Sequence, residues 1–193
     1  MNNNPHLLLW EERSPEEAEA QLLEAAKANP ADFAPLYFCY EARVYRYLRT
    51  RASNDEDADD LLQQVFLNVL EALPAYRARG IPFAAWLFRI ARHVAIDHYR
   101  RSKRSERWDF LPEEMHASTE QSPEVIALKQ EDQVRLRGLL AQLPDQKREL
   151  LALRFAAGLS TAEIAQVVGK SHASVKKQIT RLLHSLKEQY RYG

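Results

Sequence analysis

The chain has 193 residues, 46% of them hydrophobic, and its 27 Lys and Arg balance its 27 Asp and Glu. A single cysteine excludes a disulfide framework, no apolar run is long enough to span a membrane, and the N-terminal stretch lacks the basic region of a signal peptide. We therefore expect a soluble, cytoplasmic protein with one large or two small domains and no direct membrane insertion. Only five glycines, with many Leu, Ala, Glu, Arg and Gln, predict an all-α fold.

The zero net charge hides blocks of opposite sign. Residues 53–73 carry six acidic side chains and no Lys or Arg, whereas residues 76–107 carry nine Lys and Arg against two acids. Acids dominate again over residues 108–132, and bases return over residues 170–191. Such segregation predicts at least two kinds of partner surface on one chain.

The first two predicted helices have the pattern of core elements. One begins after Ser14, where Ser-Pro-Glu-Glu combines a cap, a proline at the first helical position and a glutamate at the third, and it ends near Asn29. Asp32 is expected to cap the second helix, in which Cys39 is predicted to be a small buried residue. The apolar stripe of this helix, which predicts core packing, comprises Phe33, Leu36, Tyr37, Tyr40, Val44, Tyr47 and Leu48.

A third helix is predicted to begin at residues 53–55 and to combine a buried stripe with an acidic face. The face has no Lys or Arg to pair with its acids, and Leu67 lies on it. Acids at a helix N-terminus interact favourably with the macrodipole, so a structural role alone could explain some of them. A leucine among acids and glutamines is also typical of a docking surface for a basic partner, and composition favours neither explanation.

The basic block begins after this helix, which Pro74 ends. Residues 76–83 (YRARGIPF) are predicted to form a loop, and residues 84–101 a long helix that interleaves arginines with aromatic rings. Arginines bind phosphates and aromatic rings accept unstacked bases, so the loop and the helix end favour nucleic acid. For Trp86 alone, core packing is the simpler explanation.

A change of composition separates two predicted domains, residues 1–104 and 124–193. Residues 105–123 contain Pro112, Pro123, Ser and Thr clusters and several acids without a sustained period, which predicts a flexible acidic linker. The second domain is predicted to contain a helix from residue 124 to about 143, and another over residues 145–155 that Gly158 ends.

Residues 160–187 have the pattern of a helix-turn-helix. Ser160 and Glu163 predict a capping box, Gly169 supplies the positive-φ residue that ends the first helix, and Ser171 can cap the second. A glycine turn followed by a longer helix rich in donors and positive charge suits entry into a DNA major groove. We favour this over an ordinary helical hairpin with a solvated basic face, because the three signals coincide. The apolar residues of the second helix are Val175, Ile179, Leu182, Leu183 and Leu186.

Three segments together resemble bacterial RNA polymerase sigma factors of the extracytoplasmic-function (ECF) type. They are DADDLLQQVFLNVL, FAAWLFRIARHVAIDHYRR and LPDQKRELLALRFAAGLSTAEIAQVVGKSHASVKKQITRLLHSL. The likeness extends from about Phe33 to Leu186. It implies a non-enzymatic factor that binds promoter DNA and the β and β′ subunits of core RNA polymerase, promotes DNA opening, needs no cofactor, and is held by an anti-sigma factor.

The resemblance also implies roles for individual residues. Core polymerase would contact the acidic helix at Asp60, Gln63, Gln64, Leu67 and Asn68. The −10 element would contact the loop and the following helix at Arg77, Arg79, Phe83, Trp86, Arg89, Arg92, His93, Arg100 and Arg101. The −35 element would contact the last helix at Ser171, His172, Ser174, Lys176, Lys177, Thr180 and Arg181. Many family members have Gly-Thr where this chain has Ala173-Ser174, which bears on the detail of the −35 contacts.

Two other classes of protein fit parts of the sequence. A stand-alone helix-turn-helix regulator would explain the last domain but not the acidic helix or the arginine-rich loop. A metal-dependent nuclease could use Asp57, Asp59, Asp60 and Glu71, but these acids lie at helix spacings that do not converge, and no histidine joins them. We therefore expect no metal site and no catalysis.

Overall fold

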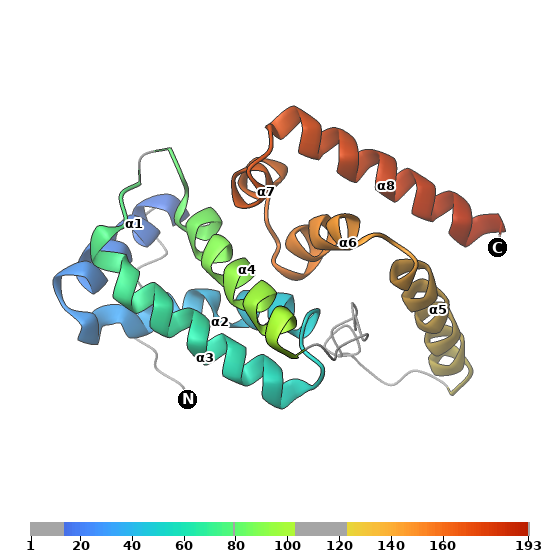
Figure 1. Cartoon of the computed structure of the whole chain (residues 1–193), viewed down its shortest axis with the longest axis horizontal. Helices are drawn as coiled ribbons and strands as arrows, with labels where there is room; N and C mark the ends of the chain where they lie inside the picture. The colour runs from blue at the N-terminus through green and yellow to red at the C-terminus, as the bar shows by residue number, and fades with distance from the viewer. Residues whose placement is uncertain (1–13, 79, 103–122, 193) are drawn as a thin grey trace.

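The computed structural model describes residues 14–78, 80–102 and 123–192, and within them the regular structure is helical (Figure 1). The N-terminal domain contains α1 (Pro15–Ala28), α2 (Ala34–Arg49), α3 (Asp55–Ala72) and α4 (Phe83–Ser102). Short 3₁₀ segments, η2 (Pro30–Phe33) and η3 (Leu73–Ala75), follow α1 and α3. No described helix has the length and apolar character that crossing a membrane requires.

Local caps explain where these helices begin. The Ser14 side chain accepts from the backbone N–H of Glu17 (3.3 Å) and the Glu17 carboxylate accepts from that of Ser14 (3.1 Å), which confirms the predicted start of α1. Asn54 caps α3 by accepting from the N–H of Asp57 at 2.7 Å. The predicted cap Asp32 is wrong, because the turn before α2 is a 3₁₀ segment capped by Asn29.

The core of the N-terminal domain is aromatic and aliphatic. Val44, Tyr47 and Leu48 of α2 are buried, and the Tyr47 ring meets the Phe88 ring of α4 edge to face with centroids 5.7 Å apart. Cys39, predicted to be buried, is exposed instead. Leu36, Tyr40 and Val44 repeat every four residues and define the inner stripe, and Cys39 lies one position off this stripe.

The C-terminal domain contains α5 (Pro123–Ala141), α6 (Asp145–Leu151), the π-helical turn η5 (Ala152–Ala156), α7 (Thr161–Val168) and α8 (His172–Tyr192). The helix predicted over residues 145–155 thus widens into a π-helical turn. Gly158 follows it with φ of 67°, a left-handed conformation that glycine adopts without strain. Of the apolar residues predicted for the last helix, Leu183 is 40% exposed, whereas the other four are buried.

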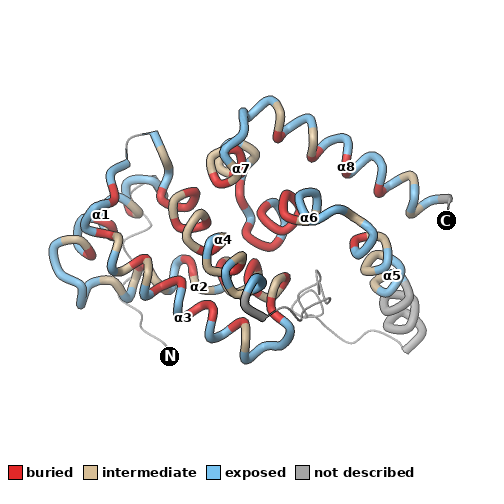
Figure 2. Tube along the Cα trace, viewed as in Figure 1, coloured by how far each residue is buried: buried red, intermediate tan, exposed pale blue. Residues whose placement is uncertain are grey.

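The two domains pack against each other. Helix α7 lies on α4, and η5 lies against α2 (Figure 1). Buried positions lie on both sides of this junction (Figure 2). Leu151 and Leu153 of the C-terminal domain belong to the same apolar cluster as Val44 and Leu48 of the N-terminal domain. The sequence predicted two domains on a tether, and nothing in it indicated that they would be docked.

Candidate nucleic-acid and protein interfaces

The acidic face of α3 is exposed to solvent. Asp60, Gln63 and Gln64 are exposed, Leu67 keeps 57% of its surface, and Asn68 is half-buried. The Gln64 side-chain amide donates to the Asn68 Oδ1 atom at 2.8 Å, which fixes the spacing of two polar groups on successive turns. The structure therefore brings all five predicted polymerase-contact residues together on one accessible surface.

A shallow hollow lies between this face and α4. It has a volume of about 400 Å³, and its polar lining includes Asp57 and Asp60 of α3 and Asp97 and His98 of α4. Three of these four side chains are carboxylates and no Lys or Arg of the described residues lines the hollow, so its charge suits a basic partner. Within the described part of the chain, no group of His, Cys, Asp and Glu side chains is arranged to hold a metal ion.

The arginine-rich loop (residues 76–83) is anchored to the N-terminal domain by contacts of aromatic side chains. The Tyr76 hydroxyl donates to the Ile81 carbonyl oxygen at 2.9 Å, and the Tyr76 ring packs on Trp86 with centroids 4.9 Å apart. Gly80 has φ of 72°, which turns the loop. Arg77 is exposed and donates to the carbonyl of Pro74 at 2.7 Å. Arg79 lies outside the described residues.

Two predicted base-contacting rings differ in exposure. Phe83 is only 2% exposed and packs against the rings of Tyr40, Tyr76 and Trp86, at centroid distances of 5.3, 5.6 and 5.5 Å. In this conformation Phe83 supports the loop from the core and offers no free face to a base. Trp86 is half-buried, so part of its indole remains at the surface.

The basic side chains of α4 divide into two groups. His93 and Arg100 are exposed, and Arg100 lies 3.9 Å from the Asp97 carboxylate one turn before it. Arg89 and Arg92 are instead half-buried beneath the C-terminal domain. Arg89 Nε donates to the backbone carbonyl of Gln166 in α7 at 2.9 Å, and Arg92 Nε lies 3.5 Å from the Glu149 carboxylate of α6. The side chain of Arg101 is outside the described part.

The predicted helix-turn-helix is present in α7 and α8. Ser160 and Glu163 form the capping box, with backbone-to-side-chain distances of 2.8 and 3.2 Å, and Gly169 ends α7 with φ of 68°. Ser171 Oγ accepts from the N–H of Ser174 at 3.3 Å and so caps α8. These local hydrogen bonds and the left-handed Gly169 end α7 and begin α8 where the sequence pattern predicts.

One face of α8 presents the predicted −35 residues to solvent. Val175 and Ile179 on the opposite face are buried, and α8 packs against α7 and α6. Ser174 is half-buried, and its hydroxyl accepts from the Gln178 side chain at 2.9 Å. The exposed polar residues of this face are Ser171, His172, Lys176, Lys177, Thr180 and Arg181.

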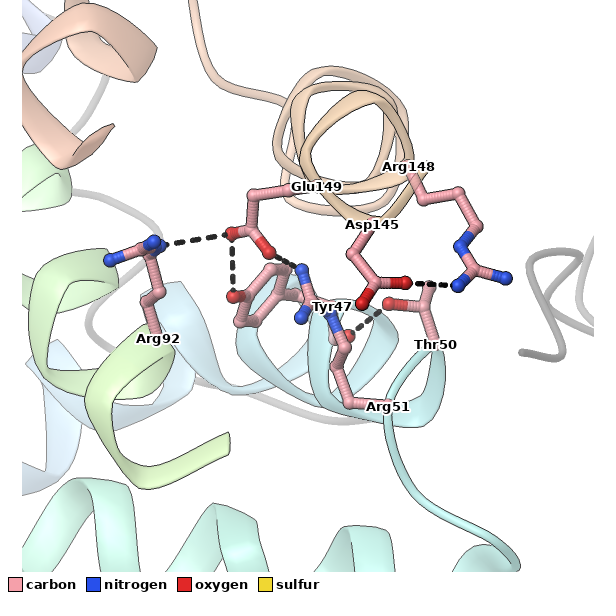
Figure 3. A network of polar contacts seen from close by, with 7 residues as sticks. All are labelled: Tyr47, Thr50, Arg51, Arg92, Asp145, Arg148 and Glu149. Atoms are coloured by element: carbon pink, nitrogen blue, oxygen red, sulfur yellow. Dashed lines mark hydrogen bonds and ion pairs between the residues drawn. The ribbon is translucent and has the colours of Figure 1, made fainter. Parts of the chain in front are cut away.

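Sequence reasoning missed a set of charged residues at the junction of the domains. Arg43 and Arg46 of α2 donate to the carbonyls of Ala157 and Ala156 at 2.9 and 3.2 Å. Glu149 is 6% exposed and forms an ion pair with Arg51 (Figure 3). The one signal in the sequence was a charged residue directly before the apolar pair Leu150 and Leu151.

Comparison with known proteins gives matches over both domains. Residues 36–105 match the family model for Sigma-70 region 2, and residues 133–191 match that for Sigma-70, region 4. The chain is 35% identical over 169 residues to the ECF RNA polymerase sigma factor BldN of Streptomyces coelicolor, covering 86% of this chain and 63% of that protein. It thus spans less than two thirds of the length of BldN.

Two further similarities cover both domains. The chain is 38% identical over 152 residues to the ECF RNA polymerase sigma factor SigD of Mycobacterium tuberculosis, covering 76% of this chain and 71% of that protein. The solved structure of CnrH, in complex with the cytosolic domain of CnrY, superposes with a TM-score of 0.64 at 26% identity, covering 89% of this chain and 96% of CnrH. The chain therefore belongs to the family of ECF RNA polymerase sigma factors.

Proposed function

We propose that this protein binds core RNA polymerase and directs it to promoters with separate −10 and −35 elements. The observation that carries the proposal is the separation of three surfaces on one chain: the acidic face of α3, the basic loop and α4, and the exposed basic face of α8. A stand-alone helix-turn-helix regulator would use the last surface only.

The −35 element would be read by α8. Its exposed side chains, which include Lys176, Lys177 and Arg181, lie on the face opposite the buried stripe, so the helix can enter a major groove without disturbing its own domain. Lysines and arginines neutralise phosphates and fix the register, whereas the hydroxyl and imidazole groups of Thr180 and His172 can reach base edges.

The −10 element would be opened and held by the loop and α4. Strand opening requires a site that offsets the cost of unstacking by binding extruded bases and gripping phosphates. Arg77 and Arg100 are exposed and can bind phosphates, and the accessible part of Trp86 can stack with a base. Phe83 is buried, and its contribution would be to hold Tyr76 and Trp86 in place.

Core polymerase would bind the acidic face of α3. Leu67 supplies an apolar centre, surrounded by the polar groups of Asp60, Gln63 and Gln64, which is the arrangement of a protein interface. The β and β′ subunits of the polymerase are the expected partners, and the complex would act in the cytoplasm. Regulation by an anti-sigma factor is expected by family membership, and the solved CnrH structure contains a bound protein segment.

A reconstituted transcription assay tests the proposal. Purified chain together with core polymerase should give run-off transcripts from a genomic promoter library, and neither component alone should do so. A chain that binds duplex DNA tightly but never redirects core polymerase would be a stand-alone regulator, and the proposal would then be wrong.

A further inference from the structure

A cavity where the two domains meet has the size of a small-molecule site. Its volume is about 330 Å³, and α4, α6 and the end of α7 supply most of its lining. Sites for small molecules have volumes of roughly 300–1,000 Å³. The cavity lies at the lower end of this range, so it suits a ligand of the size of a mononucleotide better than a dinucleotide.

One side of the cavity is a single face of α4. Four residues line it at positions i, i+3, i+4 and i+7, which share one face of a helix: Arg92, Ala95, Ile96 and Tyr99. Ala95 is buried, Ile96 is half-buried, and Tyr99 is 53% exposed. The other apolar residues of the lining are Leu150 of α6 and Val168 of α7. This lining offers an aromatic ring and aliphatic groups to a planar, apolar part of a ligand.

The charges that line the cavity are positive in sum. Three cations and two carboxylates contribute to the lining: Arg51, Arg92, Lys170, Asp145 and Glu149. Both carboxylates already have a cationic partner (Figure 3). Glu149 pairs with Arg51, and Asp145 pairs with Arg148. An anionic ligand would therefore meet cations that these carboxylates do not neutralise.

Arg92 and Lys170 are the cations that a ligand can use. Arg92 Nε lies 3.5 Å from the Glu149 carboxylate, which exceeds the roughly 2.7–3.2 Å of an ordinary N–H···O hydrogen bond. The Arg92 side chain also remains 33% exposed. Lys170 is exposed, and its Nζ atom lies 3.5 Å from the side-chain oxygen of Gln178, which is neutral and does not offset its charge.

Water is largely excluded from the charged end of the cavity. The side chains of Arg51 and Glu149 are only 12% and 8% exposed, and burial lowers the pKa of the Arg51 guanidinium. Water and salt screen charges in such a place less than charges on an open surface. A contact between an anion and Arg92 should therefore be stronger than the same contact on the exposed face of α8.

The arrangement fits a ligand with an anion at one end and a planar ring at the other. Arg92 and Tyr99 are seven residues apart in α4, which corresponds to about 10 Å along the helix axis. A nucleoside monophosphate joins a phosphate to an aromatic base through one sugar, and guanidinium and ammonium groups both bind phosphate. Inorganic phosphate would leave the apolar lining without a partner, and a nucleoside would leave the cations without one.

We propose that this cavity binds a nucleoside monophosphate, with its phosphate at Arg92 and Lys170 and its base against Tyr99. The ligand would contact α4 of the N-terminal domain and the turn between α7 and α8 of the C-terminal domain. Of these three residues, only Arg92 also belongs to a surface proposed to bind DNA. The inference therefore goes beyond the proposed function and does not depend on it.

Isothermal titration calorimetry on the full chain tests the site, with AMP, GMP, CMP and UMP as the probes. At least one of them should bind with a Kd below about 1 mM. The matching nucleoside and inorganic phosphate should each bind at least tenfold more weakly, because each makes only part of the contacts. Failure of all four probes to bind, or equally tight binding of inorganic phosphate, overturns the proposal.

Two substitutions of exposed side chains locate the bound nucleotide. Lys170→Ala keeps the backbone N–H that donates to the Ala165 carbonyl at 2.9 Å, and Tyr99→Ala truncates an exposed ring. Each should weaken nucleotide binding at least fivefold without changing the circular dichroism of the helices. Lys187→Ala removes the same charge as Lys170→Ala from an exposed position of α8 outside the lining, and it should bind like the parent.

The outcomes separate the cavity from the proposed DNA surfaces. Parent-like nucleotide binding by both Lys170→Ala and Tyr99→Ala overturns the site. A loss of nucleotide binding in Lys176→Ala/Arg181→Ala would place the ligand on the basic face of α8, and this result also overturns the site. The run-off transcription assay tests the proposed function separately, so either proposal can fail while the other stands.

Discussion

Helices α4 and α8 carry similar side chains but offer them to solvent differently. Each has an apolar stripe on one face and Lys, Arg and His on the other. On α8, Lys176, Lys177 and Arg181 are exposed, whereas on α4, Arg89 and Arg92 contact the C-terminal domain. Basic composition predicts affinity for phosphate, but the packing of other elements decides whether that affinity is available.

The largest expected effect is on the free energy of unfolding, and it concerns the apolar side of α4, which packs in the core. Phe88→Ala should lower the free energy of unfolding by about 3–5 kcal/mol, because it removes a ring that is fully buried against Tyr47. Chemical denaturation measures this change. Phe155→Ala, which truncates a ring that is 56% exposed, should stay within about 0.5 kcal/mol of the parent.

A second prediction addresses the exposed helix. The double variant Lys176→Ala/Arg181→Ala should bind promoter duplex at least tenfold more weakly, and the slope of log affinity against log salt should fall by about 2, because two phosphate contacts are lost. Titration of labelled duplex at several salt concentrations measures both. Lys147→Ala on α6 is the matched control, and an unaltered slope in the double variant would contradict the groove assignment.

A third prediction separates polymerase binding from DNA binding. Asp60→Arg should weaken binding to core polymerase at least tenfold, because a positive charge on the acidic face would meet a basic partner. Co-purification with core polymerase measures it. Asp59→Arg makes the same change of charge on the side of α3 that faces Tyr37 and Tyr45, and it should affect binding less. Equal retention by both variants would remove α3 from the interface.

The smallest expected effect concerns the turn before the groove helix. Ser160→Ala should lower the free energy of unfolding of the C-terminal domain by about 1 kcal/mol, because the N–H of Glu163 loses its acceptor. Thermal unfolding followed by circular dichroism measures it. Ser185→Ala, at an exposed position inside α8, should be neutral or slightly stabilising. Equal effects of the two variants would mean that the cap contributes nothing.

Local sequence patterns predicted most of the helices and their ends. The capping boxes at Ser14 and Ser160 and the left-handed Gly169 involve residues within four positions of each other, so the chain needs no tertiary information to form them. The same locality explains the errors. The predicted Asp32 cap was wrong because Asn29, three residues earlier, caps a 3₁₀ turn before α2. Cys39 is exposed because it precedes the buried Tyr40 by one residue, and one residue corresponds to a rotation of about 100° around the helix axis.

By itself the sequence determined an all-α chain, the acidic face of α3, the basic face of α8 and the family to which they belong. Those features depend on helical periodicity and on neighbours close in the chain. Only the tertiary structure decided that Phe83 is buried and that Arg51 and Arg92 pair with Glu149. Glu149 follows Arg51 by 98 positions and Arg92 by 57 positions in the chain. The formation of such long-range contacts depends on how whole domains pack, and no local sequence pattern predicts that packing.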